Sequence, residues 1–250
     1  MKNVKVMVLA GEGINCENES AEAFRRLGAT AEIKFVHEWQ AQPKLIHDYH
    51  ILVIPGGFSY GDELHSGQIM ALDLKYSVNE ELTDFINKKG LILGVCNGFQ
   101  VLMKLGIFEN HNGPRTMTLF HNESFKFQDR WVNCVAPPSK CVWTKNIQTM
   151  ALPARHGEGR IIFAGTDEDQ ATHYNELSEN SQIALFYTED INGSYAKIAG
   201  LTDKTGQVLG LMPHPEAALE SWLYPEHVTC DPTTPLQLFK NAIDHVQEHL

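Results

Sequence analysis

The residue types and spacing around one cysteine are the strongest indication of catalytic chemistry in this sequence. Residues 91–95 form an apolar run that predicts a buried strand, and residues 99–105 have the apolar spacing of a helix. Cys96 lies between them, with Gly94 and Gly98 on its two sides. This is the layout of a nucleophile elbow, in which small residues let the backbone pass close to a nucleophile on a tight turn. A thiol at the amino end of a helix is also favoured as the reactive thiolate. The alternative is a buried core cysteine, and the rest of the chain must decide between them.

A nucleophilic cysteine needs a base, and His214 is the best candidate. It follows an apolar segment at residues 208–212 that predicts a strand, and prolines flank it on both sides. Because the carboxyl ends of parallel strands share one edge of a sheet, His214 and Cys96 could meet there. Glu216 could then hold the imidazole in the tautomer that leaves one nitrogen facing the thiol. The alternative is a surface loop with an incidental histidine, but an elbow cysteine in the same chain favours catalysis.

A glycine pair after a third apolar segment could supply the remaining catalytic group. Residues 51–54 predict a strand, and Gly56 and Gly57 follow within Pro55-Gly-Gly-Phe-Ser-Tyr-Gly-Asp62. Paired glycines let backbone N–H groups converge on an anion, and one of these with the N–H of Asn97 would make a two-donor oxyanion hole. An ordinary turn is the alternative.

Strands and helices alternate over the first hundred residues and would position these groups. Strands are predicted at residues 4–9, 31–36, 51–54 and 91–95, and helices at residues 17–27 and 79–89. This alternation predicts a parallel sheet with helices on both of its faces.

The later part of the chain has a different pattern. Residues 118–142 predict antiparallel strands that cover one side of the sheet, and residues 168–181 predict a polar, exposed excursion. Strands are predicted again at residues 183–187, 198–201 and 208–212, and an amphipathic helix at residues 236–250. We therefore expect a single α/β domain over residues 1–250, with a mostly parallel sheet and an antiparallel extension.

Composition limits the classes of function. The chain of 250 residues has a formal net charge of -11 and no basic cluster, which argues against nucleic acid as a partner. No apolar run approaches the roughly 18 residues of a membrane span, so we expect a cytoplasmic protein with no membrane contact. The five cysteines form no C-x-x-C pair, and we interpret them as thiols: Cys16, Cys96, Cys134, Cys141 and Cys230. Metal binding by Asp62, Glu63 and His65 is an alternative, but we expect no metal site.

The motifs together resemble a known family. Gly94-Val-Cys-Asn-Gly-Phe-Gln100 with Pro213-His-Pro-Glu216 resembles class I glutamine amidotransferases, which carry a Cys-His-Glu triad on a flavodoxin-like sheet. The wider series is similar to the glutaminase subunit of phosphoribosylformylglycinamidine synthase, of purine biosynthesis. This series consists of Gly13-Ile-Asn-Cys-Glu17, Pro55-Gly-Gly-Phe-Ser-Tyr-Gly-Asp62, Asn122-Glu-Ser-Phe125, His156-Gly-Glu-Gly159 and Asn192-Gly-Ser194. The chain departs from the family at Ala217, where arginine is frequent, and residues 217–234 do not align with it.

The resemblance implies a glutaminase mechanism through a glutamyl thioester. Cys96 would attack the carboxamide carbon of glutamine, His214 would transfer protons, and Glu216 would orient His214. Backbone N–H groups at Asn97 and at Gly57 or Phe58 would hold the oxyanion.

The resemblance also implies a substrate subsite and partners. Gln100, Asn122, Ser124 and Phe125 match positions that contact the α-carboxylate and α-amino groups of L-glutamine in the class. His156 and Glu158 would shape the site from a neighbouring loop. Ammonia would pass to a synthetase subunit, with a small accessory subunit in the complex. This chain has no Walker loop, so ATP and Mg²⁺ are expected on the synthetase and no cofactor in this chain.

Two other functions remain as alternatives. The first is a glutaminase that serves a different synthetase, or a stand-alone amidohydrolase. The second is a binding or regulatory module with a dead site, which the intact Cys96, His214 and Glu216 argue against.

Overall fold

Parallel strands form the half of the main sheet that carries the motifs. The computed structural model describes residues 3–109, 114–228 and 231–249, and within them a nine-stranded sheet has the order β2-β1-β3-β4-β11-β10-β9-β6-β7. The strands from β2 to β11 in this order run parallel. They are β1 (Lys5–Ala10), β2 (Thr30–Phe35), β3 (Ile51–Ile54), β4 (Leu91–Val95) and β11 (Val208–Leu211). The order β2-β1-β3-β4-β11 is that of a flavodoxin-like sheet.

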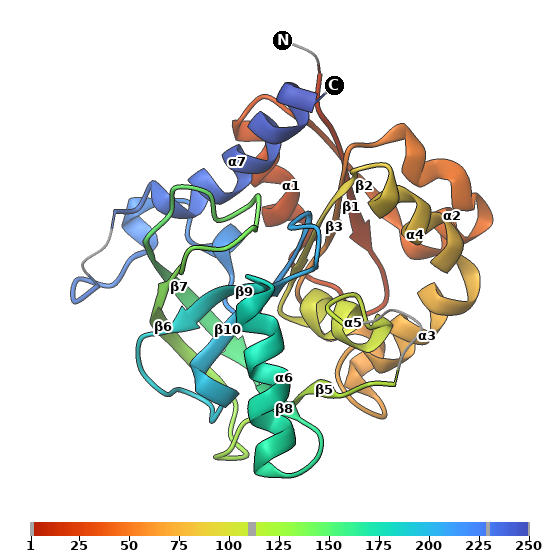
Figure 1. The fold of residues 1–250 in the computed structure, drawn as a ribbon. Helices are drawn as coiled ribbons and strands as arrows, with labels where there is room; N and C mark the ends of the chain where they lie inside the picture. Colours follow the sequence, from red (N-terminus) through yellow and green to blue (C-terminus); the bar gives the residue numbers. More distant parts are fainter. Residues whose placement is uncertain (1–2, 110–113, 229–230, 250) are drawn as a thin grey trace.

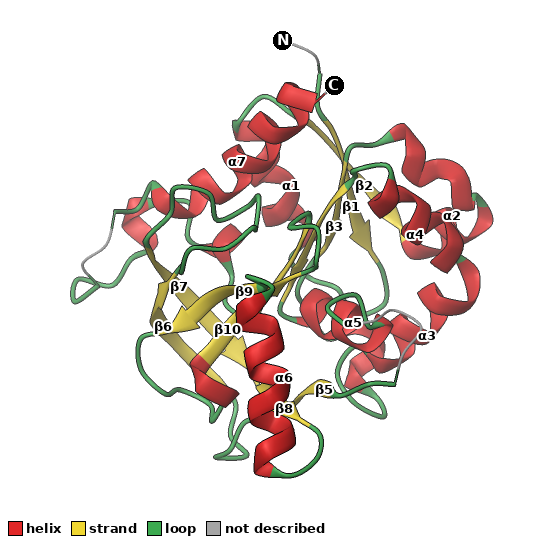
Figure 2. Ribbon diagram, in the orientation of Figure 1, coloured by secondary structure: helices red, strands yellow, loops and turns green. Residues whose placement is uncertain are grey.

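Antiparallel strands extend the sheet beyond β11. They are β10 (Ile198–Thr202), β9 (Ile183–Tyr187), β6 (Gln128–Val135) and β7 (Thr149–His156). Pro153 is tolerated within β7 because this strand is at the sheet edge, where a missing N–H breaks no ladder. A separate two-stranded sheet pairs β5 (Met117–His121) with β8 (Glu158–Phe163), and Figure 2 shows it apart from the main sheet.

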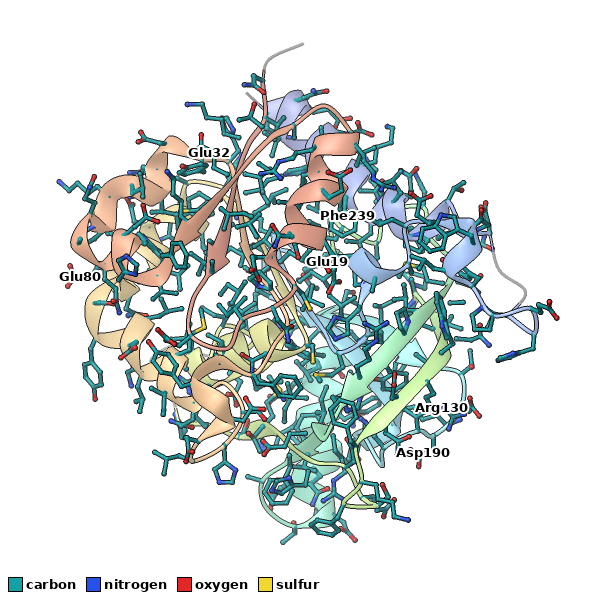
Figure 3. All side chains as sticks on the ribbon, turned by 180° about the vertical axis from the view of Figure 1, so that it is seen from behind. Glu19, Glu32, Glu80, Arg130, Asp190 and Phe239 are labelled. Carbon is teal, nitrogen blue, oxygen red and sulfur yellow. The ribbon has the colours of Figure 1, made fainter. Side chains whose placement is uncertain are left out.

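Helices cover both faces of the parallel half, as Figure 1 shows. On one face lie α1 (Glu17–Arg26) and α7 (Thr234–His249), where Phe239 meets Phe24 edge-on with ring centroids 5.2 Å apart (Figure 3). On the other side lie α3 (Gln68–Ser77), α4 (Asn79–Asn87) and α5 (Asn97–Leu105). Strands β3, β4 and β11 are buried along their whole length, so the core lies between these two helical layers. The expected α/β fold with an antiparallel extension is confirmed.

The strand register places the three motif-bearing strand ends side by side. Ile54 of β3 pairs with Gly94 of β4, and Leu211 of β11 pairs with Val95. The carboxyl ends of the three strands are therefore level, and the segments that follow them leave from the same edge of the sheet.

Several local predictions for the first half were wrong. The second strand ends at Phe35, because Val36 begins α2 (Val36–Ala41), which a 3₁₀ helix follows at Pro43–Asp48. These short helices and α3 were not predicted. In α3 apolar residues are common but are not confined to one face, so its amphipathic pattern is weak and the signal that sequence reasoning uses is missing.

More of the secondary-structure predictions were wrong in the middle of the chain. Only β5 and β6 form within residues 118–142; β5 pairs with β8 outside the main sheet, and residues 125–127 lie in the loop between the two strands. Strands β7 and β8 were not predicted. The polar excursion at residues 168–181 is instead α6 (Asp167–Glu179). Its polar composition hid a helix whose start is marked by a capping box between Thr166 and Asp169.

Two further predictions concern thiols and membranes. Cys16, Cys96, Cys134 and Cys141 are free thiols, while Cys230 and the last residue of the predicted final helix, Leu250, lie outside the described residues. Among the helices described, none has the length and apolar character needed to cross a bilayer.

Candidate active site

The Cys96 turn has the geometry of a strained elbow. Cys96 adopts φ 49° and ψ -103° between the end of β4 and the first residue of α5. A Cβ at Gly94 would lie 2.8 Å from the Gly98 carbonyl oxygen, and one at Gly98 would overlap the carbonyl of Ile54. Only glycine fits at both places, as the sequence predicted. The N–H of Cys96 donates to the Leu211 carbonyl at 2.8 Å, which fixes the turn against β11.

His214 and Glu216 form a buried pair beside this turn. The Nδ1 atom of His214 lies 2.6 Å from Oε1 of Glu216, and both side chains are almost fully buried. Burial alone would lower the pKa of His214, but the Glu216 carboxylate and then Cys96 outweigh it and hold this pKa well above its usual value. Nε2 of His214 is buried and has no hydrogen-bond partner among the described residues.

Strand β7 ties the cysteine and the histidine together. The Cys96 thiol donates to the Arg155 carbonyl at an Sγ–O distance of 3.6 Å, and the His214 N–H donates to the Pro153 carbonyl at 2.8 Å. One strand of the antiparallel extension, β7, therefore holds both Cys96 and His214 in place. Cys96 and the His214–Glu216 pair, which the sequence placed after two different strands, lie in one site.

The glycine loop after β3 contacts the start of α5. Its Phe58 N–H donates to the Gly13 carbonyl at 2.8 Å, whereas no described residue accepts a hydrogen bond from the Gly57 N–H. The Asn97 side chain accepts from the Ser59 N–H at 3.2 Å and donates to Asp62 Oδ1 at 3.2 Å. These bonds hold the loop at the amino end of α5, where the Asn97 N–H lacks an intrahelical acceptor.

Of the residues predicted to bind the substrate, Gln100 and Asn122 are buried, and Ser124 and Phe125 are exposed. The Gln100 amide is engaged with the Asn97 side chain and the Glu158 carbonyl. The Asn122 amide donates to the Lys126 and His156 carbonyls. Ser124 and Phe125 follow in an exposed turn, with 77% of Phe125 exposed.

His156 is a neutral histidine next to the site. Asn122 uses its Nδ2 as a donor, so its Oδ1 accepts from Nδ1 of His156 at 3.0 Å. Burial, followed by repulsion from His214, lowers the pKa of His156 to about 4. Nε2 is therefore an unprotonated acceptor at neutral pH, and it is buried without a partner among the described residues. The ring does not compete with His214 for a proton.

Two residues near His214 were not assigned to the site from the sequence. Sγ of Cys16 lies 4.0 Å from Nδ1 of His214, and burial raises the pKa of this thiol. Gly56 lies against the imidazole, where a Cβ would be 2.6 Å from Cε1 of His214. The only local signals were the Asn-Cys pair before a helix and the first glycine of a pair. Cys16, His214 and Glu216 lie close enough together to surround a cation, but the short His214–Glu216 contact favours a catalytic pair.

We predict that Gly56→Ala lowers catalytic turnover by about 100-fold, because a new methyl group would displace the His214 ring from Glu216. Steady-state kinetics and a thermal melt would separate misplacement of the ring from unfolding. Gly157→Ala is the matched control, since its Cβ would meet only Phe127 at 3.8 Å. Unchanged turnover in Gly56→Ala would contradict the close packing under His214.

The chain matches one protein family over nearly its whole length. Residues 3–246 match the family model described as the CobB/CobQ-like glutamine amidotransferase domain. A curated relative, the phosphoribosylformylglycinamidine synthase subunit PurQ of Methanococcus maripaludis, is 40% identical over 96% of this chain and 97% of its own length. The PurQ subunit of Dehalococcoides mccartyi is 34% identical over 90% of this chain and 89% of its own length.

A solved structure has the same fold. A chain of the PurLQS structure from Thermotoga maritima superposes with a TM-score of 0.77 and 27% sequence identity, covering 98% of this chain and 100% of that chain.

Proposed function

We propose a function from one premise: the chain belongs to the CobB/CobQ-like glutamine amidotransferase family, and within it to the PurQ subunits of phosphoribosylformylglycinamidine synthase. It hydrolyses L-glutamine to glutamate and ammonia, and the ammonia serves a synthetase that makes phosphoribosylformylglycinamidine in purine biosynthesis. The observation that carries this proposal is that Cys96, after β4, and the His214–Glu216 pair, after the neighbouring strand β11, lie at one edge of the sheet in such a chain.

Cys96 supplies the nucleophile in the proposed mechanism. Its sulfur attacks the carboxamide carbon of glutamine, and His214 carries the thiol proton to the departing ammonia. Glu216 holds Nδ1 of His214, which leaves the unpartnered Nε2 for these transfers. The raised pKa of His214 keeps a proton available for the leaving group. Water then hydrolyses the glutamyl thioester, with His214 as the base.

The oxyanion of each tetrahedral intermediate is held by two backbone donors. The Phe58 N–H is already bonded to Gly13, so we assign the loop donor to Gly57 rather than Phe58. The second donor is the N–H of Asn97, at the positive end of α5.

The amino-acid end of glutamine is proposed to lie over the turn after β5. Ser124 and Phe125 are exposed there and can contact the substrate directly. Gln100 and Asn122 are buried with their amide groups engaged, and they support the subsite through Glu158 and His156. A charged end of the substrate requires such polar surroundings, because burying an unpaired charge is costly.

A synthetase subunit is the proposed partner, together with a small accessory subunit, and ATP and Mg²⁺ are assigned to the synthetase. An exposed apolar rim made of Phe58, Leu64, Phe125 and Phe127 surrounds the loops of the site. Phe58 and Phe127 stack with ring centroids 6.4 Å apart, linking two sides of this rim. Exposed apolar groups that gather in this way are typical of protein interfaces. We propose that residues 1–250 act as one domain, which the family match over residues 3–246 supports.

Reconstitution tests this function. The chain mixed with a cognate synthetase, formylglycinamide ribonucleotide and ATP is expected to form the amidine from glutamine, and the synthetase alone only from ammonia. Phe125→Ser is expected to weaken the glutamine-dependent reaction while ammonia-dependent synthesis is unchanged. Glutamine hydrolysis that no such synthetase uses would instead indicate another acceptor or a stand-alone amidohydrolase.

A further inference from the structure

Two histidines and a glutamate meet at the rim of the active site without hydrogen bonds to one another. His65 lies before α3, His121 ends β5, and Glu158 begins β8. Nδ1 of His121 is 3.5 Å from Oε1 of Glu158, and Nδ1 of His65 is 4.0 Å from the same atom. One ligand atom from each residue lies within 4.8 Å of the others, and the two imidazole centroids are 6.1 Å apart.

These interatomic distances are closer to those between two ligand atoms of one metal ion than to those of hydrogen bonds. Ligand atoms about 2.1 Å from a tetrahedral zinc ion lie about 3.4 Å from one another. A hydrogen bond between an imidazole and a carboxylate would be about 2.8 Å long. The observed distances of 3.5 Å and 4.0 Å need only small side-chain rotations to enclose a cation.

The carboxylate is oriented for this role by its neighbours. Oε2 of Glu158 accepts a hydrogen bond from the Ser66 N–H at 3.2 Å, which leaves Oε1 facing the two histidines. Only 13% of the Glu158 side chain is exposed, whereas 55% of His65 and 41% of His121 are exposed. The site therefore has a fixed inner ligand, two outer ligands and a side open to solvent, where water can complete the coordination.

The surrounding charge also favours a cation. Asp62 and Glu158 both accept hydrogen bonds from Ser66, Asp62 from its hydroxyl at 2.8 Å and Glu158 from its N–H at 3.2 Å, so the two carboxylates lie close together. Lys104 is the neighbouring cation that interacts with both carboxylates. Two carboxylates beside one ammonium leave a net negative charge next to the two imidazoles.

We propose that His65, His121 and Glu158 form a binding site for a divalent cation of the zinc class. Two imidazole nitrogens and one carboxylate oxygen suit this class better than Mg²⁺ or Ca²⁺, which prefer oxygen ligands. From the sequence we expected no metal site, and His65 was a candidate ligand only together with Asp62 and Glu63. The pairing of β5 with β8 instead places His121 opposite Glu158, and His65 lies beside them.

A cation at this site would link two parts of the glutaminase site. His65 follows the loop that carries Gly57 and Asp62, whose backbone is held in left-handed conformations at Asp62 and Leu64. The backbone carbonyl of Glu158 itself accepts a hydrogen bond from the Gln100 side chain. Coordination would therefore tie the oxyanion loop to the wall of the substrate subsite.

The test measures metal binding itself, without catalysis. Thiols are first removed with Cys16→Ser and Cys96→Ser, because Cys16 and His214 offer a competing site. Chelator-treated protein is titrated with Zn²⁺ by calorimetry and with Co²⁺ by visible absorption. We expect one equivalent to bind, with d–d bands and no sulfur-to-cobalt charge transfer, and the melting temperature to rise.

Single substitutions locate the ion. His65→Ala and His121→Ala are each expected to weaken Zn²⁺ binding by at least about 10-fold. His37→Ala is the matched control, since His37 is exposed and lies outside the cluster. Equal binding by all three variants would overturn the proposal, as would no binding by the parent protein at about 1 mM Zn²⁺. Loss of binding on His47→Ala instead would place the ion at the separate cluster of His47, Glu81 and Asp84.

Discussion

Cys96→Ala is expected to abolish glutamine-dependent amidine formation in the complex with the synthetase, a loss on the order of 10⁴-fold or more. Without the sulfur of Cys96 the thioester cannot form. None of the other thiols in the described part of the chain is suited to replace it, because burial raises the pKa of Cys16, Cys134 and Cys141. The assay is product formation with glutamine and, separately, with ammonium salt. Ammonia-dependent synthesis should survive, because that step belongs to the partner.

Cys141→Ala is the matched control for this substitution, since it removes a buried thiol away from His214. Circular dichroism and binding to the synthetase would show that both variants fold and assemble. If Cys96→Ala lost the glutamine and ammonia reactions equally, the division of work between the two subunits would be refuted. If glutamine turnover persisted, Cys96 would be only a core cysteine.

Glu216→Gln is expected to lower turnover by about 10²- to 10⁴-fold and to shift the pH profile. The glutamine side chain retains the shape and an acceptor oxygen for Nδ1 of His214, but it removes the negative charge. Because the Glu216 carboxylate raises the pKa of His214, its loss lowers that pKa. The imidazolium that donates to ammonia exists only below this pKa, so the alkaline limb of the activity profile should move to lower pH.

Glu220→Gln is the matched control, because Glu220 belongs to the same segment but pairs with Arg26 at the surface. The measurement is turnover and KM for glutamine across pH. A profile that keeps its alkaline limb in Glu216→Gln, whatever the loss of rate, would argue against the His214–Glu216 charge pair. A change in KM alone would indicate a role in substrate binding.

The positions of the candidate catalytic residues could be predicted from the sequence because their signals are local. Cys96 directly follows a short apolar strand, and Gly57 and His214 come soon after the ends of theirs. Strands that run parallel in one sheet bring such positions to one edge. The need for glycine on both sides of Cys96 could also be predicted, because the backbone passes too close at these positions to leave room for a Cβ.

Prediction failed where apolar periodicity was weak or where pairing partners were distant. The polar helix α6 is stabilised at its start by a capping box rather than by a broad apolar face. The alternating pattern of β5 predicted a strand correctly but could not show that it leaves the main sheet to pair with β8. A period of two identifies a strand and its two faces, and it carries no information about the partner strand.

The sequence by itself indicated the alternating strands and helices, the elbow turn and the candidate residues Cys96, His214 and Glu216, because each of these signals depends on residues that are neighbours in the chain. Only the tertiary structure decided that the Phe58 N–H is taken by Gly13, that Cys16 and Gly56 lie against His214, and that His65 and His121 face Glu158. These contacts join segments far apart in sequence. They form through the packing of the whole fold, so no local pattern of residue types can encode them.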